Sequence, residues 1–267
     1  MTNTGPDARQ GIQSIEVGFQ LLDVLASTNR PMMLRDIAKG ANMPPAKAHR
    51  YMVSFMRIGL VEQDRGSGKY DLGQYALKLG LASLGRVDPI RLADPVLDEL
   101  CEEIQETVEL AIWGTHGATI VRIVDAGGPV TVTLRPGTVL PLCTSATGKT
   151  FAAFYRSPFL KMQLDQELEV QARTQKIAVT TLRRQLEKSL AEIRAAGLSR
   201  ASGSLTPGIN GVSAPVFDHT GQMVAALTSL GPVGEFNVEG DGPVAKAMLN
   251  ASKKLSQRLG RQENLLT

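Results

Sequence analysis

The chain has 267 residues, of which 43% are hydrophobic and 21% are charged. This composition is ordinary for a globular protein, and the length is sufficient for two domains with separate cores. The net charge of +3 is small but unevenly distributed. Residues 1–87 hold 11 Lys and Arg against 7 Asp and Glu, whereas the remainder holds 18 against 19. This positive excess is what binding to DNA phosphates requires.

Secretion, membrane insertion and metal binding find no support in the sequence. Residues 1–11 are polar and lack the apolar core of a signal peptide. No apolar run approaches the roughly 18 residues that a membrane span needs. Two cysteines and three histidines form no metal-ligand pattern. We therefore expect a cytoplasmic protein with reduced thiols and without metal or cofactor.

Two helices are predicted at the start of the chain. Apolar residues recur at spacings of three and four over residues 14–26, which indicates a helix with Ser14 as its N-cap. Leu34, Ile37 and Ala38 form the apolar stripe of a second, shorter helix. The glycine and asparagine that follow it are typical of a helix end.

A third helix is predicted after the second one, because paired prolines stop a helix but preset the first turn of the next. Its apolar positions can face a core, while its N-terminal end is polar and basic. In a helix-turn-helix, that end of the second helix of the motif meets base edges. For Lys47 and Arg50, this position favours contact with DNA over a merely solvated face. For His49, contact with a phosphate or packing is a better interpretation than a pH switch. The candidate DNA-contacting residues on this helix are Pro45, Ala46, Lys47, His49 and Arg50.

A strand–turn–strand hairpin and an apolar helix follow the third helix. Arg65 and Lys69 flank a Gly-Ser-Gly tip, so the hairpin is predicted to be the wing of a winged helix-turn-helix and both residues to contact DNA. Residues 72–86 are helical and apolar on more than one face. Such a helix must be covered, and a second copy of itself is the natural cover. The Asp88-Pro89 step then separates a DNA-binding domain, residues 1–87, from a second domain, residues 88–267.

The second domain is predicted to be α+β. Helices are expected at both ends of the segment, with mostly antiparallel strands between them, as in a sensor domain. The expected helices are residues 90–107, 145–155, 180–196 and 244–259. The expected strands are residues 109–113, 119–124, 130–134, 212–217 and 223–229, the last two joined by a tight turn.

Three features of this domain could indicate catalysis or anion binding. Residues 145–150 (SATGKT) resemble the end of a P-loop, but Cys143 stands where such a loop needs glycine. We therefore expect a helix whose exposed first amides could hold a small carboxylate. Cys143 has no recognisable histidine base, so a buried structural thiol is the better interpretation. Arg122 and Arg135 could clamp an acid, but strand arginines at an edge are more often solvated.

The blocks of sequence described above, in this order and spacing, resemble transcriptional regulators of the IclR (isocitrate lyase regulator) family over nearly the whole chain. The matching blocks are residues 14–25, 44–50, 59–61, 70–73, 135–137, 140–142, 146–150, 208–218 and 225–232.

The resemblance implies an N-terminal winged helix-turn-helix, a linker helix that dimerises, and a C-terminal GAF-like domain that binds an effector. It also implies homodimers or dimers of dimers on double-stranded DNA operators of a catabolic operon, controlled by a small organic acid. The acid's carboxylate would lie against the amides of Ala146 and Thr147. The implied effector-binding positions are Val132, Leu140, Ala146, Thr147, Ala201, Ile209, Gly211, Thr228 and Leu230.

The chain departs from the family at the polar positions of this pocket. Ala201, Gly211 and Leu230 replace hydrogen-bonding side chains and leave Thr228 as the polar one, while Cys143 stands where the family often has histidine. A two-carbon acid would be poorly paired there, so we expect a larger acid with an apolar, for example aromatic, body. Two other functions stay open: an enzyme with an appended DNA-binding domain, and a DNA-binding structural protein without a ligand. The absence of an acid–base constellation in the sequence disfavours the first.

Overall fold

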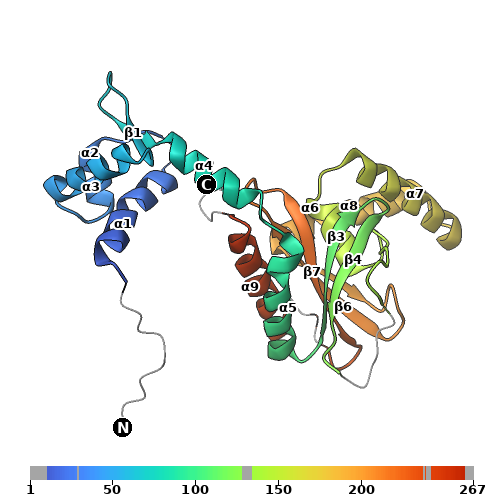
Figure 1. The fold of residues 1–267 in the computed structure, drawn as a ribbon. Helices are drawn as coiled ribbons and strands as arrows, with labels where there is room; N and C mark the ends of the chain where they lie inside the picture. The colour runs from blue at the N-terminus through green and yellow to red at the C-terminus, as the bar shows by residue number, and fades with distance from the viewer. Residues whose placement is uncertain (1–10, 29, 128–133, 237, 239–241, 262–267) are drawn as a thin grey trace, which may run out of the picture. The chain divides into compact units, whose positions relative to one another are not determined.

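The computed structural model describes residues 11–28, 30–127, 134–236, 238 and 242–261 (Figure 1). The chain divides into two compact units, Met1–Val87 and Asp88–Thr267. Val132, one of the expected effector-binding residues, lies outside the described residues, as does most of the expected strand 130–134.

The first unit is the predicted winged helix-turn-helix. Its elements are α1 (Gln13–Ser27), α2 (Leu34–Gly40), α3 (Pro45–Arg57), the antiparallel hairpin β1 (Val61–Gln63) and β2 (Tyr70–Leu72), and α4 (Gln74–Leu84). The apolar stripes of the first three helices meet the hairpin in one core, which includes Leu21, Ile37, Met52 and Tyr70. The prediction of Ser14 as N-cap is wrong: α1 begins at Gln13, and Ile12 occupies the cap position without a side-chain hydrogen bond.

The turn between α2 and α3 follows from its residues. Asn42 takes a left-handed conformation (φ 47°), which asparagine tolerates, and Met43 then turns its side chain into the core. Pro45 opens α3 at its first position, where a missing amide hydrogen costs nothing. Gly59, with φ 75°, ends the turn after α3 and directs the chain into β1.

The second unit is the predicted α+β domain. Its sheet has the order β4-β3-β7-β6-β5, and every recorded pairing is antiparallel. The strands are β3 (Thr107–Gly114), β4 (Gly117–Val124), β5 (Ser199–Ser202), β6 (Ile209–Phe217) and β7 (Met223–Pro232). The helices are α5 (Pro89–Ile104), α6 (Ala146–Phe154), α7 (Pro158–Gln175), α8 (Val179–Ala196) and α9 (Pro243–Arg258).

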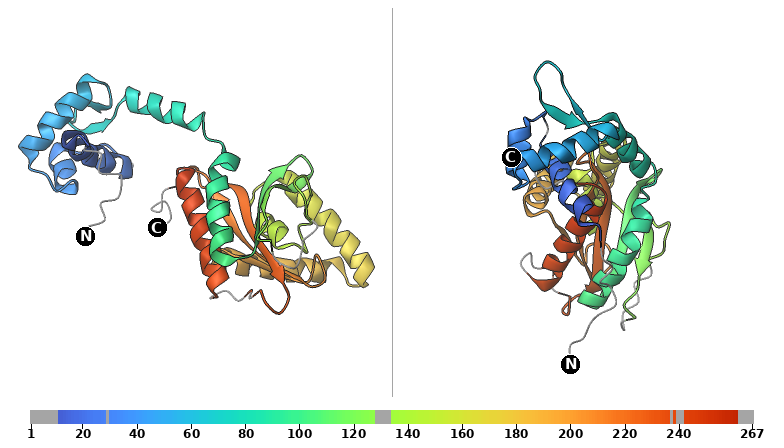
Figure 2. Two further views of the ribbon diagram at one scale, coloured as in Figure 1. Left: turned by 60° about the horizontal axis from the view of Figure 1, so that its bottom comes forward. Right: turned by 60° about the vertical axis from the view of Figure 1, so that its left-hand side comes forward.

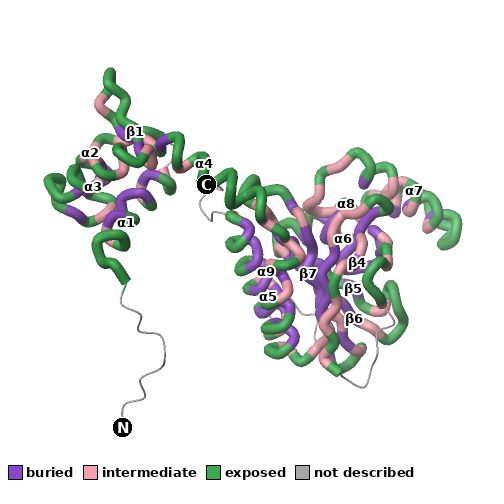
Figure 3. The backbone as a smooth tube through the Cα atoms, viewed as in Figure 1, coloured by how far each residue is buried: buried purple, intermediate pink, exposed green. Residues whose placement is uncertain are grey.

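Helices cover both faces of this sheet, so the unit has three layers. The amphipathic helices α5 and α9 pack on each other and on one face, while α6 lies on the other face and is backed by α8 (Figures 1 and 2). Purple, buried segments in Figure 3 follow the central strands and the sheet-facing sides of α5 and α9. α6 is thereby held with its N-terminus close to β6 and β7.

The structure adds two elements that the sequence analysis did not predict and shortens another. α7 is an 18-residue helix, and β5 is a four-residue edge strand. The expected helix 72–86 begins only at Gln74, because Leu72 pairs with Val61 as the last residue of β2. Leu134, at the end of the expected strand 130–134, belongs to no strand.

Candidate functional site

The N-terminal end of α3 forms an exposed polar surface on the first unit. Ala48 and Met52 are buried and fix the helix on its core, which leaves the other side of the first two turns open. All five residues proposed from the sequence are exposed there: Pro45, Ala46, Lys47, His49 and Arg50. A helix presented in this way has the geometry that places side chains on base edges in the major groove.

The hairpin between β1 and β2 is held in shape by its own hydrogen bonds. The carboxylate of Asp64 accepts hydrogen bonds from both the amide (2.7 Å) and the hydroxyl of Ser67, and these bonds lower the pKa of Asp64. Gly68 turns the chain back with φ 72°. Arg65 and Lys69 are exposed beside this turn, so both charges are available to a polyanion.

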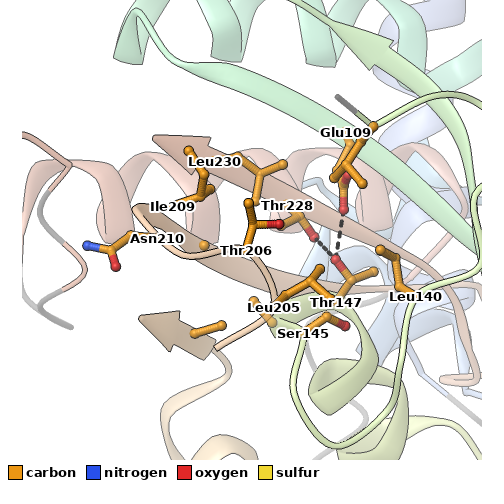
Figure 4. A pocket seen from close by; sticks show the side chains of 14 residues that line it. Glu109, Leu140, Ser145, Thr147, Leu205, Thr206, Ile209, Asn210, Thr228 and Leu230 are labelled. Atoms are coloured by element: carbon orange, nitrogen blue, oxygen red, sulfur yellow. Dashed lines mark hydrogen bonds between the residues drawn. The ribbon is translucent and has the colours of Figure 1, made fainter. Parts of the chain in front are cut away.

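A pocket lies in the second unit between the N-terminus of α6 and the sheet (Figure 4). Eight of the nine positions implied to bind an effector line it, namely Leu140, Ala146, Thr147, Ala201, Ile209, Gly211, Thr228 and Leu230. The other lining residues are Glu109, Leu134, Ser145, Leu205, Thr206 and Asn210. Figure 4 shows the Asn210 side chain directed away from the others, and its amide nitrogen donates to the Phe236 carbonyl at 3.3 Å.

The first turn of α6 presents two amides at this pocket. Ser145 is the N-cap, and its hydroxyl accepts a hydrogen bond from Gly148 N at 2.8 Å. The amides of Ala146 and Thr147 make no hydrogen bond to another described residue. Both residues are buried, so the expectation of exposed amides is wrong. Two unpaired amides at a helix N-terminus attract an anion, and burial strengthens that attraction.

Glu109 introduces an ionisable group that the sequence analysis missed. Its carboxyl is only 1% exposed, and Oε1 lies 2.8 Å from the hydroxyl of Thr147. That hydroxyl lies 2.8 Å from Thr228 Oγ1, which in turn donates to Ser213 Oγ at 2.9 Å. Burial raises the pKa of Glu109 to about 7, although the Thr147 hydrogen bond opposes the shift. Glu109 Oε2 has no hydrogen-bond partner among the described residues.

The missed residues change the expected character of the pocket. Glu109, Ser145 and Thr147 supply polar groups beside Thr228, so the predicted single polar side chain is wrong. A glutamate inside the otherwise apolar run of residues 108–113 was the available signal, because charged side chains are rarely placed in such runs without a purpose. The sequence showed that the first turn of α6 is polar, but not that Thr147 contacts Glu109 of β3.

The pocket is also smaller than expected. A Cβ on Gly211 would lie 3.2 Å from Leu230 Cδ2 and 3.4 Å from Ala146 Cβ, so neighbouring side chains fill the space that glycine leaves. The cavity volume is about 20 Å³, which is room for a single water molecule. A bound organic acid therefore requires Leu205, Leu230 or another lining side chain to move.

The other candidates from the sequence have structural roles. Cys143 is a free, buried thiol, and burial together with the nearby Glu167 raises its pKa to about 12, which is unsuitable for a nucleophile. Glu167 instead accepts hydrogen bonds from Leu142 N and Cys143 N, each at 2.9 Å. Arg122 forms an exposed ion pair with Asp94 at 2.7 Å, and Arg135 is exposed.

Neither a metal site nor a membrane span is found in the described part of the chain. No group of three or more His, Cys, Asp or Glu side chains there could hold a metal ion. None of the described helices has the length and apolar character required to cross a bilayer.

Both units match models of one protein family. Residues 14–65 match the family described as IclR helix-turn-helix domain, and residues 81–257 match the one described as Bacterial transcriptional regulator IclR C-terminal. The chain belongs to the IclR family. It is a DNA-binding transcriptional regulator, and the alternative of an enzyme with an appended DNA-binding domain is set aside.

Similar proteins agree with this assignment over nearly the full length. The crystal structure of HmgR from Pseudomonas aeruginosa is 36% identical, with a TM-score of 0.85 and coverage of 95% of this chain and 100% of that one. The regulator BhcR of Paracoccus denitrificans is 27% identical over 94% of this chain and 89% of its own. The Transcriptional repressor IclR of Escherichia coli is 26% identical, with coverage of 96% and 93%.

Proposed function

We propose that this IclR-family regulator controls a catabolic operon in response to a small organic acid bound between α6 and the sheet. The observation that carries the proposal is the gathering of eight implied effector positions around one pocket at the α6 N-terminus. The unpaired amides of Ala146 and Thr147 suit a carboxylate. Leu134, Leu140, Ile209 and Leu230 suit the apolar body of an acid larger than glyoxylate or pyruvate.

We also propose that α4 pairs with a second copy of the chain. None of its residues is buried, although several of them are large and apolar. The side chains of Leu77, Leu81 and Leu84 are 62%, 59% and 42% exposed. These three leucines lie on one side of the helix, and α1 adds Ile15 and Phe19, also exposed. A chain with such apolar surface on a DNA-binding unit is suited to form a homodimer, or a dimer of dimers, on a two-half-site operator.

A screen of small carboxylic acids against the full chain tests the effector. Acids that bind the folded state raise its melting temperature by mass action. We expect benzoate-like acids to raise it more than glyoxylate or pyruvate do, and to change affinity for a DNA site selected from random sequences. If the chain binds its selected DNA but no carboxylic acid changes either property, a ligand-independent DNA-binding protein is the better description.

A further inference from the structure

Glu109, Thr147, Thr228 and Ser213 form one buried hydrogen-bonded row beneath α6. The strand registers place Glu109 opposite Thr228 and Thr228 opposite Ser213, so their side chains lie side by side across three strands. Thr147 reaches down from α6 and joins the row at Glu109 and Thr228 (Figure 4). The pocket opens at the glutamate end of this row.

The row has three oxygen–oxygen contacts, and each needs one proton. The contacts are 2.8 Å for Glu109–Thr147, 2.8 Å for Thr147–Thr228 and 2.9 Å for Thr228–Ser213, the last with Thr228 as donor. If Glu109 were ionised, Thr147 would donate to it, and because Thr228 donates to Ser213, no proton would remain for the contact between Thr147 and Thr228. If Glu109 is a carboxylic acid, its own proton serves Thr147, Thr147 serves Thr228, and every contact is a hydrogen bond. With Thr228 as the donor to Ser213, the row is complete only with Glu109 in its acid form.

Among the residues that the structure describes, the surroundings of Glu109 provide no cation that would favour ionisation. Thr147 faces it from α6, Thr228 from β7, Ile123 from β4 by strand register, and Leu140 from the segment before α6. The cations on α6 and β4 have other partners: Lys149 donates to the Arg200 carbonyl, and Arg122 of β4 pairs with Asp94. Glu109 is also the sole ionisable side chain among the described residues that line the pocket. The pKa of about 7 agrees with an acid form that persists to neutral pH.

The remaining oxygen, Oε2, is buried and has no partner in the described part of the chain, which is costly unless a ligand supplies one. With the proton on Oε1, Oε2 is a carbonyl-like acceptor and calls for a donor. Thr147 lies next to this acceptor and also belongs to the N-terminus of α6, where its amide is one of the two unpaired amides that suit an anion. A ligand carboxylate on those amides would lie close to Glu109, and two negative charges there would repel each other.

We propose that Glu109 determines specificity by admitting organic acids that carry a hydroxyl or N–H donor besides the carboxylate, and that it binds them in its acid form. This inference rests on the proposed function of the pocket. The ligand carboxylate lies on the amides of Ala146 and Thr147, and its donor group lies on Glu109 Oε2. Affinity then falls as rising pH ionises Glu109, because the ionised carboxylate repels the bound anion.

Two substitutions separate the parts of this proposal. Glu109→Gln keeps the shape and imitates the acid form, with its amide NH₂ facing Thr147 and its carbonyl facing the ligand, but it cannot ionise. Glu109→Leu removes the acceptor. The probes are benzoate and 2-, 3- and 4-hydroxybenzoate, titrated calorimetrically into the full chain at pH 6 and pH 8.

We expect the best hydroxybenzoate to bind wild type at least about fivefold more tightly than benzoate at pH 6, since an unmet buried acceptor is costly. Its affinity for wild type should fall roughly tenfold from pH 6 to pH 8, as a pKa near 7 requires. Glu109→Gln should match wild type at pH 6 and keep that affinity at pH 8. Glu109→Leu should lose the preference for the hydroxyl group.

Equal pH dependence in wild type and Glu109→Gln, or a hydroxyl preference that survives in Glu109→Leu, would overturn the proposal and leave an acid-binding pocket in place. If none of the four acids binds wild type while DNA binding is intact, the proposed effector class fails together with this inference.

Unfolding in urea tests the acid form without any ligand. The pKa of Glu109 is raised in the folded state. Between about pH 4.5 and pH 7, the folded chain therefore holds a proton on Glu109 that the unfolded chain has lost. Stability conferred by this group is therefore lost as pH rises through that window. The urea midpoint of wild type should fall relative to that of Glu109→Gln between pH 5 and pH 7. Parallel profiles would overturn the acid-form assignment.

Discussion

A methyl group has no room at Gly148, where α6 crosses the turn that precedes it. A Cβ there would lie 2.0 Å from the Pro141 carbonyl oxygen and 2.7 Å from Leu142 Cα. Both are backbone atoms and cannot rotate away. Alanine normally stabilises a helix by about 1 kcal/mol relative to glycine. We nevertheless expect Gly148→Ala to lower the free energy of unfolding by roughly 3 kcal/mol, measured in urea.

The matched control for Gly148 is Ala152→Gly in the same helix, which should cost about 1 kcal/mol through helix propensity alone. A Gly148→Ala chain as stable as wild type would show that the turn at Pro141 does not lie against α6.

Cys143 should be chemically inert in the folded chain. Burial, and secondarily the carboxylate of Glu167, raise its thiol pKa to about 12, so the reactive thiolate is scarce at pH 8. Cys101 is buried, and its pKa is raised as well. We expect alkylation by iodoacetamide at pH 8 to be at least about tenfold slower in native protein than in urea. Fast labelling of Cys143 in native protein, located by mass spectrometry, would contradict this.

Some residues of the pocket could be predicted from the sequence, and others could not. Leu140, Ala146, Thr147 and Thr228 came together in the pocket as the resemblance implied. Glu109 could not be assigned to that pocket, because its role depends on the pairing of β3 with β7, which joins residues more than 100 positions apart. The space expected at Gly211 depended on side-chain positions that a sequence does not specify.

Among the elements, α3 should carry the base contacts of the first unit. Arg50 is exposed near the start of α3, whereas Arg57 is exposed in its last turn. Since the N-terminal part of the recognition helix meets base edges, we expect Arg50→Ala to weaken binding to the selected DNA site by roughly 1–3 kcal/mol. Fluorescence anisotropy at fixed moderate salt measures this.

Arg57→Ala removes the same charge from the same helix and is the control for Arg50. It should lower affinity for specific and non-specific DNA alike, through loss of a distant positive charge. If the two variants lose the same affinity on every sequence, α3 does not read bases with Arg50.

Elements were predictable where local signals agreed with periodicity. The α2–α3 turn has an asparagine in a left-handed conformation followed by paired prolines, and the structure has the predicted break there. α7 was missed although Ser157 and Pro158 form a regular helix start, with the Ser157 hydroxyl accepting from Phe159 N at 3.2 Å. Its apolar residues are too scattered to give a clear periodicity, because α7 buries little more than Leu160, Leu168 and Ala172.

Assembly of the whole molecule should depend on α4. Because successive residues are separated by about 100° around a helix, Leu77, Leu81 and Leu84 share one side and Ser83 lies nearly opposite Leu81. Placing a charge in an apolar contact between copies costs several kcal/mol. We expect Leu81→Glu to shift the chain towards monomer in sedimentation velocity and to weaken binding to a two-half-site DNA, but not to a single half-site.

Ser83→Glu adds the same charge to the same helix and should leave the association state unchanged. A wild-type chain that sediments as a monomer at micromolar concentration would remove the premise of this prediction. Equal dissociation by both variants would assign the effect to helix charge rather than to the leucine face.

The narrowness of the pocket has a consequence for the speed of the response. A cavity with a volume of about 20 Å³ cannot receive an acid at the moment of collision, so entry must wait until its walls part. Trp113 is the single tryptophan of the chain. It packs on Phe151 and Tyr155, with ring centroids 5.7 and 5.0 Å away, towards the C-terminal end of α6, whose N-terminus lines the pocket. Its fluorescence after rapid mixing should relax at a rate that stops rising with acid concentration. The regulator would then respond only to acid concentrations that stay raised for longer than the pocket takes to open, and not to briefer pulses.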